Sequence, residues 1–98
     1  MAYKVVISTI AKSNIRDALV YYKNVVSLKV AQNFVKDYEN TLLKITQNPF
    51  FQLYYKDFRG LVLKKFPYII FYQVDEPNKI IIIKAVFNTH QNTFKRPV

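Results

Sequence analysis

The chain has 98 residues, of which 51% are hydrophobic and 16% aromatic, so its composition is that of a folded domain and not of a disordered segment. It has no cysteine, which excludes disulfides and thiolate metal sites and favours an intracellular protein. The net charge of +9 favours a polyanionic partner, which is nucleic acid, an anionic membrane surface or an acidic protein. A genome biased towards lysine is a further explanation of that charge.

The length predicts a single domain over residues 1–98. Apolar runs such as Ile80 to Ile83 are far shorter than the roughly 20 residues that span a bilayer. The segment from Met1 to Ile10 lacks the basic start and apolar stretch of a signal peptide. We therefore expect a cytoplasmic protein with no membrane partner.

The first half of the chain predicts one strand and two helices. Tyr3 to Ser8 has β-branched residues at its centre and is expected to be a strand, with Thr9 as the N-cap of a helix over residues 11–26. A break at Ser27-Leu28 precedes the second helix, which Asn48-Pro49 ends. The apolar stripe of the second helix is formed by Val30, Phe34, Tyr38, Thr41, Leu42 and Ile45, whereas Lys36, Asp37, Glu39, Asn40 and Lys44 fall largely outside it.

The second half of the chain predicts four strands joined by short connections, so neighbouring strands should be antiparallel. Gly60 is expected to take a positive φ in a turn over residues 57–60. The segment from Asn88 onward is polar and basic and is expected to be a tail. The predicted strands cover residues 53–56, 61–65, 68–74 and 79–87.

These elements give an α+β fold, in which an N-terminal strand and an antiparallel helical hairpin pack on one face of a mostly antiparallel β-sheet. The runs Ile69–Tyr72 and Ile80–Ile83 are apolar on both pleat faces. A hairpin covers one face, so we expect the opposite face to be open and apolar, as a partner site is. The alternatives are that the tail or a second copy of the chain covers it.

The block from Phe58 to Asn92, FRGLVLKKFPYIIFYQVDEPNKIIIIKAVFNTHQN, follows two helices and resembles the ParE/RelE superfamily of toxins from bacterial type II toxin–antitoxin systems. The resemblance covers nearly the whole chain. Family members carry a histidine and an arginine around the last segment. Here Asn88 and Gln91 hold the matching positions, with His90 between them.

The resemblance implies a small basic toxin, a plasmid stabilisation protein, that an acidic antitoxin neutralises by wrapping around it. Two mechanisms occur in the superfamily. RelE-like members cleave messenger RNA on the ribosome without metal, whereas ParE-like members poison DNA gyrase by binding it.

Two arginines of RelE-like members are absent from this chain, and their absence favours gyrase poisoning over RNA cleavage. They would fall near Ile69 and Thr89, neither of which is basic. Cleavage without metal needs several convergent cations and a proton carrier. Lys64 and Lys65 partly match the basic positions of the preceding strand, but adjacent strand residues point to opposite faces. The ParE manner is thus favoured, the RelE-like endoribonuclease is the runner-up, and a degenerate non-toxic member is a third reading; whether the chain is an enzyme stays open.

The candidate binding residues are cations and one histidine, and no catalytic residue is assigned. Arg59 precedes Gly60 and is placed to clamp a phosphate or carboxylate, or else to pair with Asp57 or face solvent. One histidine and scattered carboxylates predict no metal site, and no cofactor is expected. The candidates are Arg59, Lys64, Lys65, His90, Lys95 and Arg96.

The aromatic residues divide into two groups. Tyr22, Phe34, Tyr38 and Phe71 lie on helix stripes or in strands and are expected in the core. The residues expected to be free to contact a partner are Tyr54, Tyr55 and Phe94.

Overall fold

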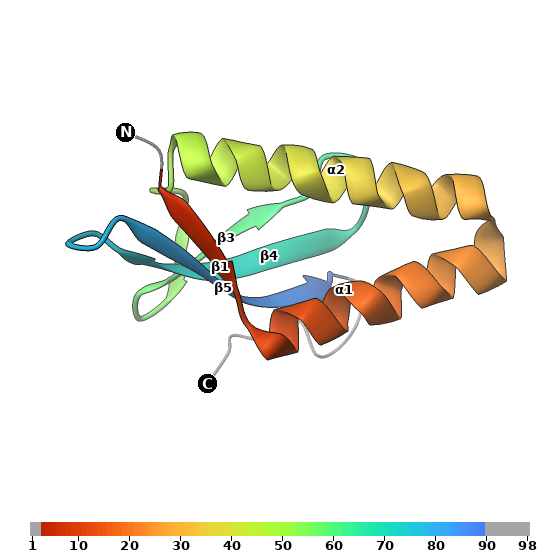
Figure 1. The fold of residues 1–98 in the computed structure, drawn as a ribbon, viewed down its shortest axis with the longest axis horizontal. Coiled ribbons are helices and arrows are strands. Elements are labelled where there is room, and N and C mark those ends of the chain that lie inside the picture. The colour runs from red at the N-terminus through yellow and green to blue at the C-terminus, as the bar shows by residue number, and fades with distance from the viewer. Residues whose placement is uncertain (1–2, 90–98) are drawn as a thin grey trace.

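The computed structural model describes residues 3–89, which form two helices lying on one side of a five-stranded sheet (Figure 1). The strands are β1 (Lys4–Ile7), β2 (Leu53–Tyr55), β3 (Phe58–Val62), β4 (Tyr68–Asp75) and β5 (Ile80–Asn88). The helices are α1 (Thr9–Tyr21) and α2 (Leu28–Gln47). This is the α+β arrangement that the sequence predicts, and neither helix combines the length and apolar composition needed to cross a bilayer.

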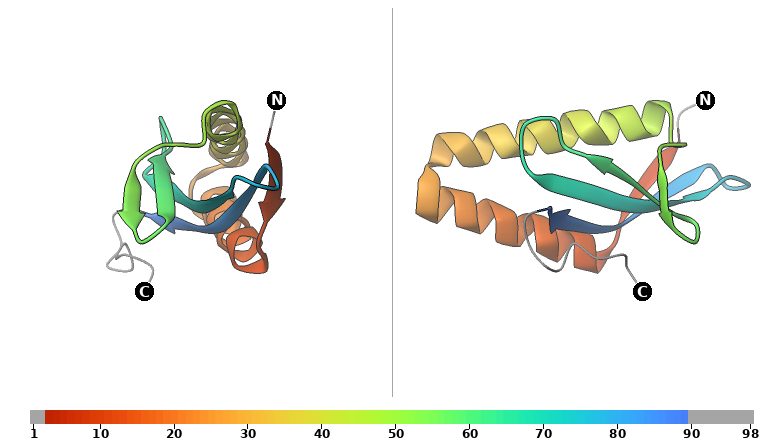
Figure 2. Two further views of the ribbon diagram at one scale, coloured as in Figure 1. Left: turned by 90° about the vertical axis from the view of Figure 1, so that its left-hand side faces the viewer. Right: turned by 180° about the vertical axis from the view of Figure 1, so that it is seen from behind.

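The strand order is β1-β5-β4-β3-β2, so the first and last strands of the chain are neighbours. β1 pairs with β5 in parallel, with Lys4 opposite Ile80, and the other three pairs are antiparallel. The view from behind shows the sheet in front of both helices (Figure 2). A register shift between Phe71 and Tyr72 marks a bulge in the pairing of β4 with β5.

Serine hydroxyls begin both helices. The Ser8 Oγ accepts a hydrogen bond from the Ala11 amide at 3.1 Å and donates one to the Lys84 carbonyl at 3.0 Å, so it ties the start of α1 to β5. The prediction of Thr9 as the cap is therefore wrong by one residue. Ser27 caps α2 through the Val30 amide, after a π-helical turn, η1 (Tyr22–Val26), that closes on the Ser27 amide.

The core lies between the helices and the sheet. Tyr72, Ile70 and Tyr68 of β4 point towards the helices, in register with Ile83 and Val86 of β5. An aromatic cluster formed by Tyr22, Phe34, Phe66 and Tyr68 closes the end of this layer beneath the helical hairpin, with ring centroids 5.1 to 6.2 Å apart. The predicted core aromatics Tyr22, Phe34, Tyr38 and Phe71 are all buried.

The face of the sheet opposite the helices is closed at its centre. Ile69 and Phe71 are 0% and 1% exposed there, and Ala85, opposite Phe71, is buried. The rings of Tyr54 and Phe87 pack edge-on against Phe71 at 5.5 and 5.8 Å. The prediction of an open apolar face is therefore wrong, because bulky side chains of the neighbouring strands contribute a cover that strand periodicity does not reveal.

The connections around β3 also differ from the prediction. Gly60 lies within β3 without a positive φ, and Lys56, with φ of 52°, makes the β2–β3 turn instead. β3 ends at Val62, so Lys64 and Lys65 lie in the β3–β4 loop and not in a strand. The argument that these two lysines point to opposite strand faces therefore no longer applies.

Candidate functional site

Arg59 fastens the segment that follows α2. Its guanidinium donates a hydrogen bond to the Phe51 carbonyl at 2.7 Å and lies 5.2 Å from the centre of the Phe50 ring. Tyr72, opposite Arg59 in the sheet, donates its hydroxyl to the Pro49 carbonyl at 2.7 Å. The carboxylate of Asp57 instead accepts from the side-chain amide of Gln73, so the pairing with Asp57, one of the alternatives for Arg59, does not form and Arg59 contacts backbone and ring.

Lys64 and Lys65 are carried by a loop that a buried carboxylate holds. Asp37 of α2 is 5% exposed, and its oxygens accept from the amides of Lys64 at 3.3 Å, Lys65 at 2.7 Å and Phe66 at 3.0 Å. Three successive N–H groups around one anion form a nest. The backbone is thereby fixed, while both lysine side chains remain exposed.

Two cavities of about 400 and 390 Å³ lie between α2 and this loop. Lys65, Asp37 and Asn40 line both of them. Lys44 and Lys64 add two more cations to the first cavity, and Lys36 adds one to the second. The structure thus joins Lys64 and Lys65 to two lysines of α2, whereas Arg59 lines neither cavity.

Sequence reasoning missed the role of Asp37 and placed it outside the apolar stripe of α2. Asp37 lies three residues after Phe34 and four before Thr41, both of which are buried. Residues at these spacings share a helix face. A carboxylate at a core-facing position was therefore the readable signal, since such a group must find donors inside the protein.

The remaining candidates lie where the structure gives no description. His90, Lys95, Arg96 and Phe94 all fall outside residues 3–89, and their roles stay predictions. Tyr54 and Tyr55 are half-buried, and Tyr54 is engaged with Phe71 and so is less free than expected.

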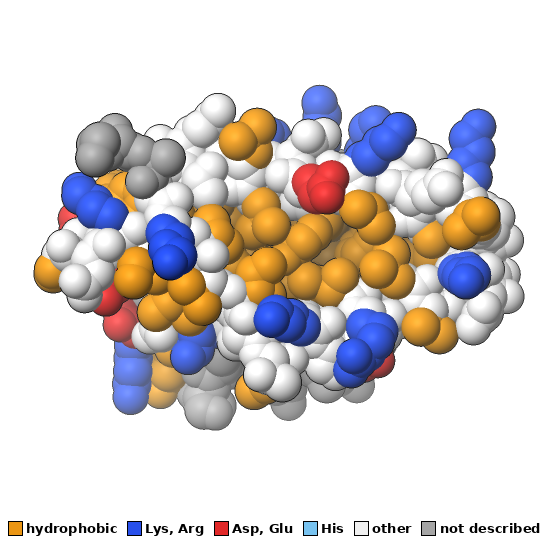
Figure 3. Space-filling view, in the orientation of Figure 1, with side chains coloured by type: hydrophobic (Ala, Val, Ile, Leu, Met, Phe, Trp, Pro, Cys, Tyr) orange, Lys and Arg blue, Asp and Glu red, His pale blue; other side chains and the backbone are white. Residues whose placement is uncertain are grey.

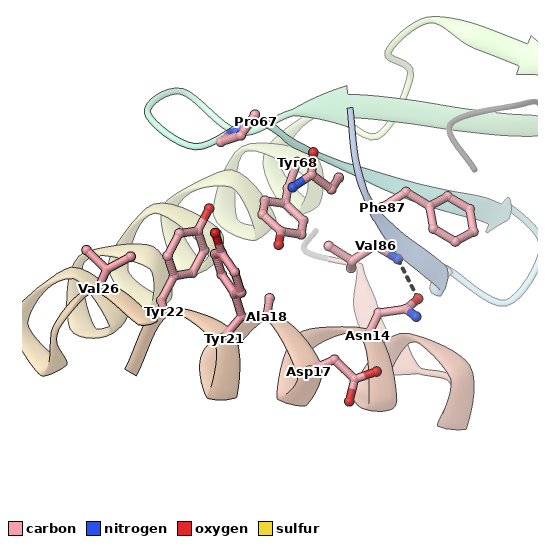
Figure 4. A pocket seen from close by; sticks show the side chains of 11 residues that line it. Asn14, Asp17, Ala18, Tyr21, Tyr22, Val26, Pro67, Tyr68, Val86 and Phe87 are labelled. Carbon is pink, nitrogen blue, oxygen red and sulfur yellow. Dashed lines mark hydrogen bonds between the residues drawn. The ribbon is translucent and has the colours of Figure 1, made fainter. Parts of the chain in front are cut away.

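A cavity of about 590 Å³ separates the C-terminal half of α1 from the ends of β4 and β5 (Figure 4). Asn14 lies at one side of it and accepts a hydrogen bond from the Val86 amide at 3.0 Å. Burial raises the pKa of Tyr22 from its ordinary value of 10.0 to about 12, so its hydroxyl stays protonated to a higher pH than a free tyrosine. None of the described residues that line the cavity is a Lys, Arg or His, so it offers no cation to a phosphate.

A groove with a purely apolar floor runs between the outer sides of α1 and α2, near the tip of the hairpin. Figure 3 shows an apolar area along the gap between the two helices, with Lys and Arg side chains on both sides and one acidic side chain at its upper edge. We call this the interhelical groove; its volume is about 250 Å³, and its charged residues, Arg16 and Lys23, are both cations. The residues that line it are Arg16, Leu19, Val20, Lys23, Leu28, Ala31, Gln32 and Val35.

The two positions at which the resemblance to RelE-like members leads us to expect arginine, residues 69 and 89, carry no cation in this chain. Ile69 is fully buried, and the Thr89 amide donates to the Pro67 carbonyl at 2.7 Å. Within residues 3–89 there is also no group of three His, Cys, Asp or Glu side chains arranged to hold a metal ion.

Comparison with known proteins places these features in a family. A family model described as the ParE toxin of the type II toxin–antitoxin system parDE matches residues 5–93. A search of curated proteins gave no match to the chain.

Three solved structures share the fold at low sequence identity. A chain of the chromosomal ParDE toxin–antitoxin system of P. aeruginosa superposes with a TM-score of 0.78 at 15% identity, over 90% of this chain and 97% of that one. A chain of the intact E. coli RelBE complex gives 0.63 at 16% identity, with coverages of 92% and 100%. A chain of the RelBE2 complex of Mycobacterium tuberculosis gives 0.60 at 14% identity, with coverages of 90% and 99%.

All three structures come from toxin–antitoxin systems. The resemblance noted in the sequence is confirmed, since the family model spans most of the chain. The chain belongs to the family of ParE toxins, the toxin components of type II toxin–antitoxin systems.

Proposed function

We infer that the chain is neutralised by an acidic antitoxin segment bound in the interhelical groove, and that it poisons DNA gyrase by binding and not by RNA cleavage. The family match over residues 5–93 is the observation that carries this proposal. The geometry adds two supports, one for each half of it.

The first support concerns the antitoxin. The floor of the interhelical groove is apolar, and both charged residues at its edge are cations. A second copy of this chain would bring another charge of +9 to the same surface and be repelled. An amphipathic helix with an apolar stripe and acidic flanks fits the groove, because it satisfies the floor and the rim together.

The second support concerns the mechanism. RelE-like cleavage depends on arginines at positions that here hold a buried isoleucine, Ile69, and Thr89, which bonds to Pro67. Arg59, the remaining arginine of the sheet, is occupied by the Phe51 carbonyl. Stabilising a phosphorane-like charge takes several convergent cations, so protein binding is the better fit.

The antitoxin half is tested by reading the gene next to this one; if it encodes a small acidic protein, that protein is purified and titrated with this chain by calorimetry. Leu28→Glu places a negative charge in the groove and should weaken binding by at least about tenfold. Ile10→Glu is the matched control, because Ile10 of α1 is exposed to a similar extent, 64% against 58%, and lines neither the groove nor the cavities beside the β3–β4 loop. Equal affinities of the two variants would remove the groove from the interface.

The gyrase half is tested by inducing the chain in bacteria and by supercoiling assays with purified DNA gyrase. We expect loss of supercoiling and an SOS response. Fragmented messenger RNA, relieved by Lys64→Ala or Arg59→Ala in a folded protein, would support the endoribonuclease instead. Normal growth would indicate a degenerate member.

A further inference from the structure

One side of α2 carries a stripe of long polar side chains. Asn33, Lys36, Asn40, Lys44 and Gln47 follow one another at spacings of three or four residues, and all are exposed. Such spacings place side chains on one helix face. The stripe is about 21 Å long at 1.5 Å per residue.

The β3–β4 loop runs beside this stripe and encloses the two cavities of about 400 and 390 Å³. It contributes Lys64 and Lys65, whose backbone amides Asp37 fixes in place. We call the whole surface the α2–loop cleft. Its four lysines are Lys36, Lys44, Lys64 and Lys65.

Among the described residues, the positive charge of the α2–loop cleft is only partly compensated, since four lysines lie beside one carboxylate. Asp37 is the one acidic residue among the described residues that line it, and three backbone amides occupy its oxygens. Within the described part of the chain, none of the four lysine side chains pairs with a carboxylate. Four like charges gathered in one cleft repel one another, and an external anion relieves that repulsion.

The chemistry of the lining separates this cleft from the interhelical groove. Amide side chains, which donate hydrogen bonds to phosphate oxygens, alternate with the lysines of α2. An acidic protein helix would also need an apolar floor; the α2–loop cleft has three apolar lining residues, Val30, Leu43 and Phe66, whereas the floor of the interhelical groove is purely apolar. The length of the stripe matches about six nucleotide steps at 3.4 Å each.

We propose that the α2–loop cleft binds the phosphate backbone of nucleic acid without reading its sequence. Lysine ammonium groups neutralise successive phosphates, and Asn40, between the two cavities, donates to a phosphate oxygen. The site is distinct from the antitoxin groove and does not depend on the identity of the toxin's target.

The test measures fluorescence anisotropy of a labelled 20-base-pair DNA duplex and a labelled 20-nucleotide RNA, titrated with the full chain between 50 and 200 mM NaCl. Four phosphate contacts predict that log K falls with log salt with a slope of about −3 to −4 on duplex DNA. Each single change, such as Lys65→Gln, should lower the magnitude of that slope by about 1. The two probes distinguish duplex DNA from single-stranded RNA as the source of the phosphates.

The decisive comparison uses two quadruple variants with the same net charge. The first replaces all four cleft lysines by Gln, and we expect at least about a tenfold loss of affinity at 100 mM NaCl. The matched control removes four exposed lysines outside both the cleft and the interhelical groove and should lose much less; it carries Lys4→Gln, Lys12→Gln, Lys29→Gln and Lys56→Gln.

Equal losses in the two quadruple variants would show that net charge alone attracts the nucleic acid, and would overturn the proposal. So would a wild-type chain that binds neither probe at 100 mM NaCl. The wild-type chain and the cleft variant are also titrated with labelled poly-glutamate. If the cleft variant loses affinity for poly-glutamate and keeps its affinity for nucleic acid, the cleft binds an acidic protein instead. Thermal unfolding of each variant confirms that the fold survives.

Discussion

Gly60 is needed because neighbouring side chains leave no room for a Cβ, and not because its backbone takes a positive φ. A Cβ at this position would lie 2.9 Å from Cε1 of Tyr54 and 3.0 Å from Cδ1 of Ile69. Both atoms belong to the cover of the sheet face opposite the helices. The sequence predicted a turn glycine because it is the single glycine of the chain, and only the tertiary contact reveals the actual reason for it.

Gly60→Ala should therefore destabilise the fold by about 1 kcal/mol, because the ring of Tyr54 must move away from Phe71. Urea unfolding measures the change. In a Tyr54→Ala background the same substitution should cost less, since the obstructing ring is gone. If Gly60→Ala lowers the unfolding free energy equally in the Tyr54→Ala background, contact with the Tyr54 ring is not the cause of the destabilisation.

Two buried tyrosine hydroxyls differ in their partners. The Tyr38 hydroxyl is buried with no hydrogen-bond partner among the described residues, whereas the Tyr72 hydroxyl donates to the Pro49 carbonyl. Tyr38→Phe should raise the free energy of unfolding by about 1 kcal/mol, and Tyr72→Phe should lower it by a similar amount. Both substitutions remove one hydroxyl oxygen. Chemical denaturation of the two variants should therefore give changes in unfolding free energy of opposite sign. Destabilisation by Tyr38→Phe would reveal a hidden partner.

Burial also makes the fold sensitive to high pH. It raises the pKa of Tyr22 and of Tyr38 to about 12, above the ordinary value of 10.0. A raised folded-state pKa means that the protonated form is favoured by folding, so this contribution to stability is complete below pH 10 and is lost as the pH rises towards 12. Thermal melts between pH 9 and 12 should show a falling melting temperature, and the fall should be smaller in Tyr38→Phe.

At the scale of elements, the order of strands and helices could be predicted because each follows its own hydrophobic period. The end of β3 could not. The amides of residues 64–66 turn towards Asp37, which lies 27 to 29 positions earlier in the chain. No window of local sequence contains that contact, so Lys64 and Lys65 were expected in a strand and are found in a loop.

Asp37→Asn should release the β3–β4 loop from α2. The amide group keeps one acceptor oxygen and presents an NH₂ to backbone donors, so we expect a loss of about 1 to 3 kcal/mol in unfolding free energy. Hydrogen exchange should accelerate at the amides of residues 64–66 more than in the centre of β4. Glu39→Gln, an exposed change on the same helix, is the control. Equal acceleration throughout the sheet would contradict a local lock.

At the scale of the whole molecule, we expect two different surfaces to bind two different partners, the interhelical groove an acidic antitoxin and the α2–loop cleft nucleic acid. The interhelical groove is apolar with a basic rim, and the α2–loop cleft is polar and basic. The composition predicted an affinity for anions. The net charge alone could not show which surface binds them, because lysines are distributed along the whole sequence. The sequence also predicted an open apolar surface on the sheet face opposite the helices, and side chains of adjacent strands close the centre of that face.

The charge of +9 further predicts how salt acts on the free toxin. Repulsion among the lysines opposes the compact state and is screened at higher ionic strength, so the melting temperature of the free chain should rise between 20 and 300 mM NaCl. The complex with an acidic antitoxin should respond in the opposite sense, because the same ions weaken the attraction. Calorimetric melts of both forms provide the comparison. If the melting temperature of the free chain falls with added salt, repulsion among the lysines is smaller than the other effects of salt on stability.

The pairing of β1 with β5 joins positions 76 apart, Lys4 and Ile80. β5 occupies the place between β1 and β4, so a polypeptide released early from the ribosome lacks the strand that bridges its first segment to the rest. Contacts this distant in sequence form late. Translation products that end before β5 therefore lack the central pairing of the sheet, and we expect them to be unfolded and inactive.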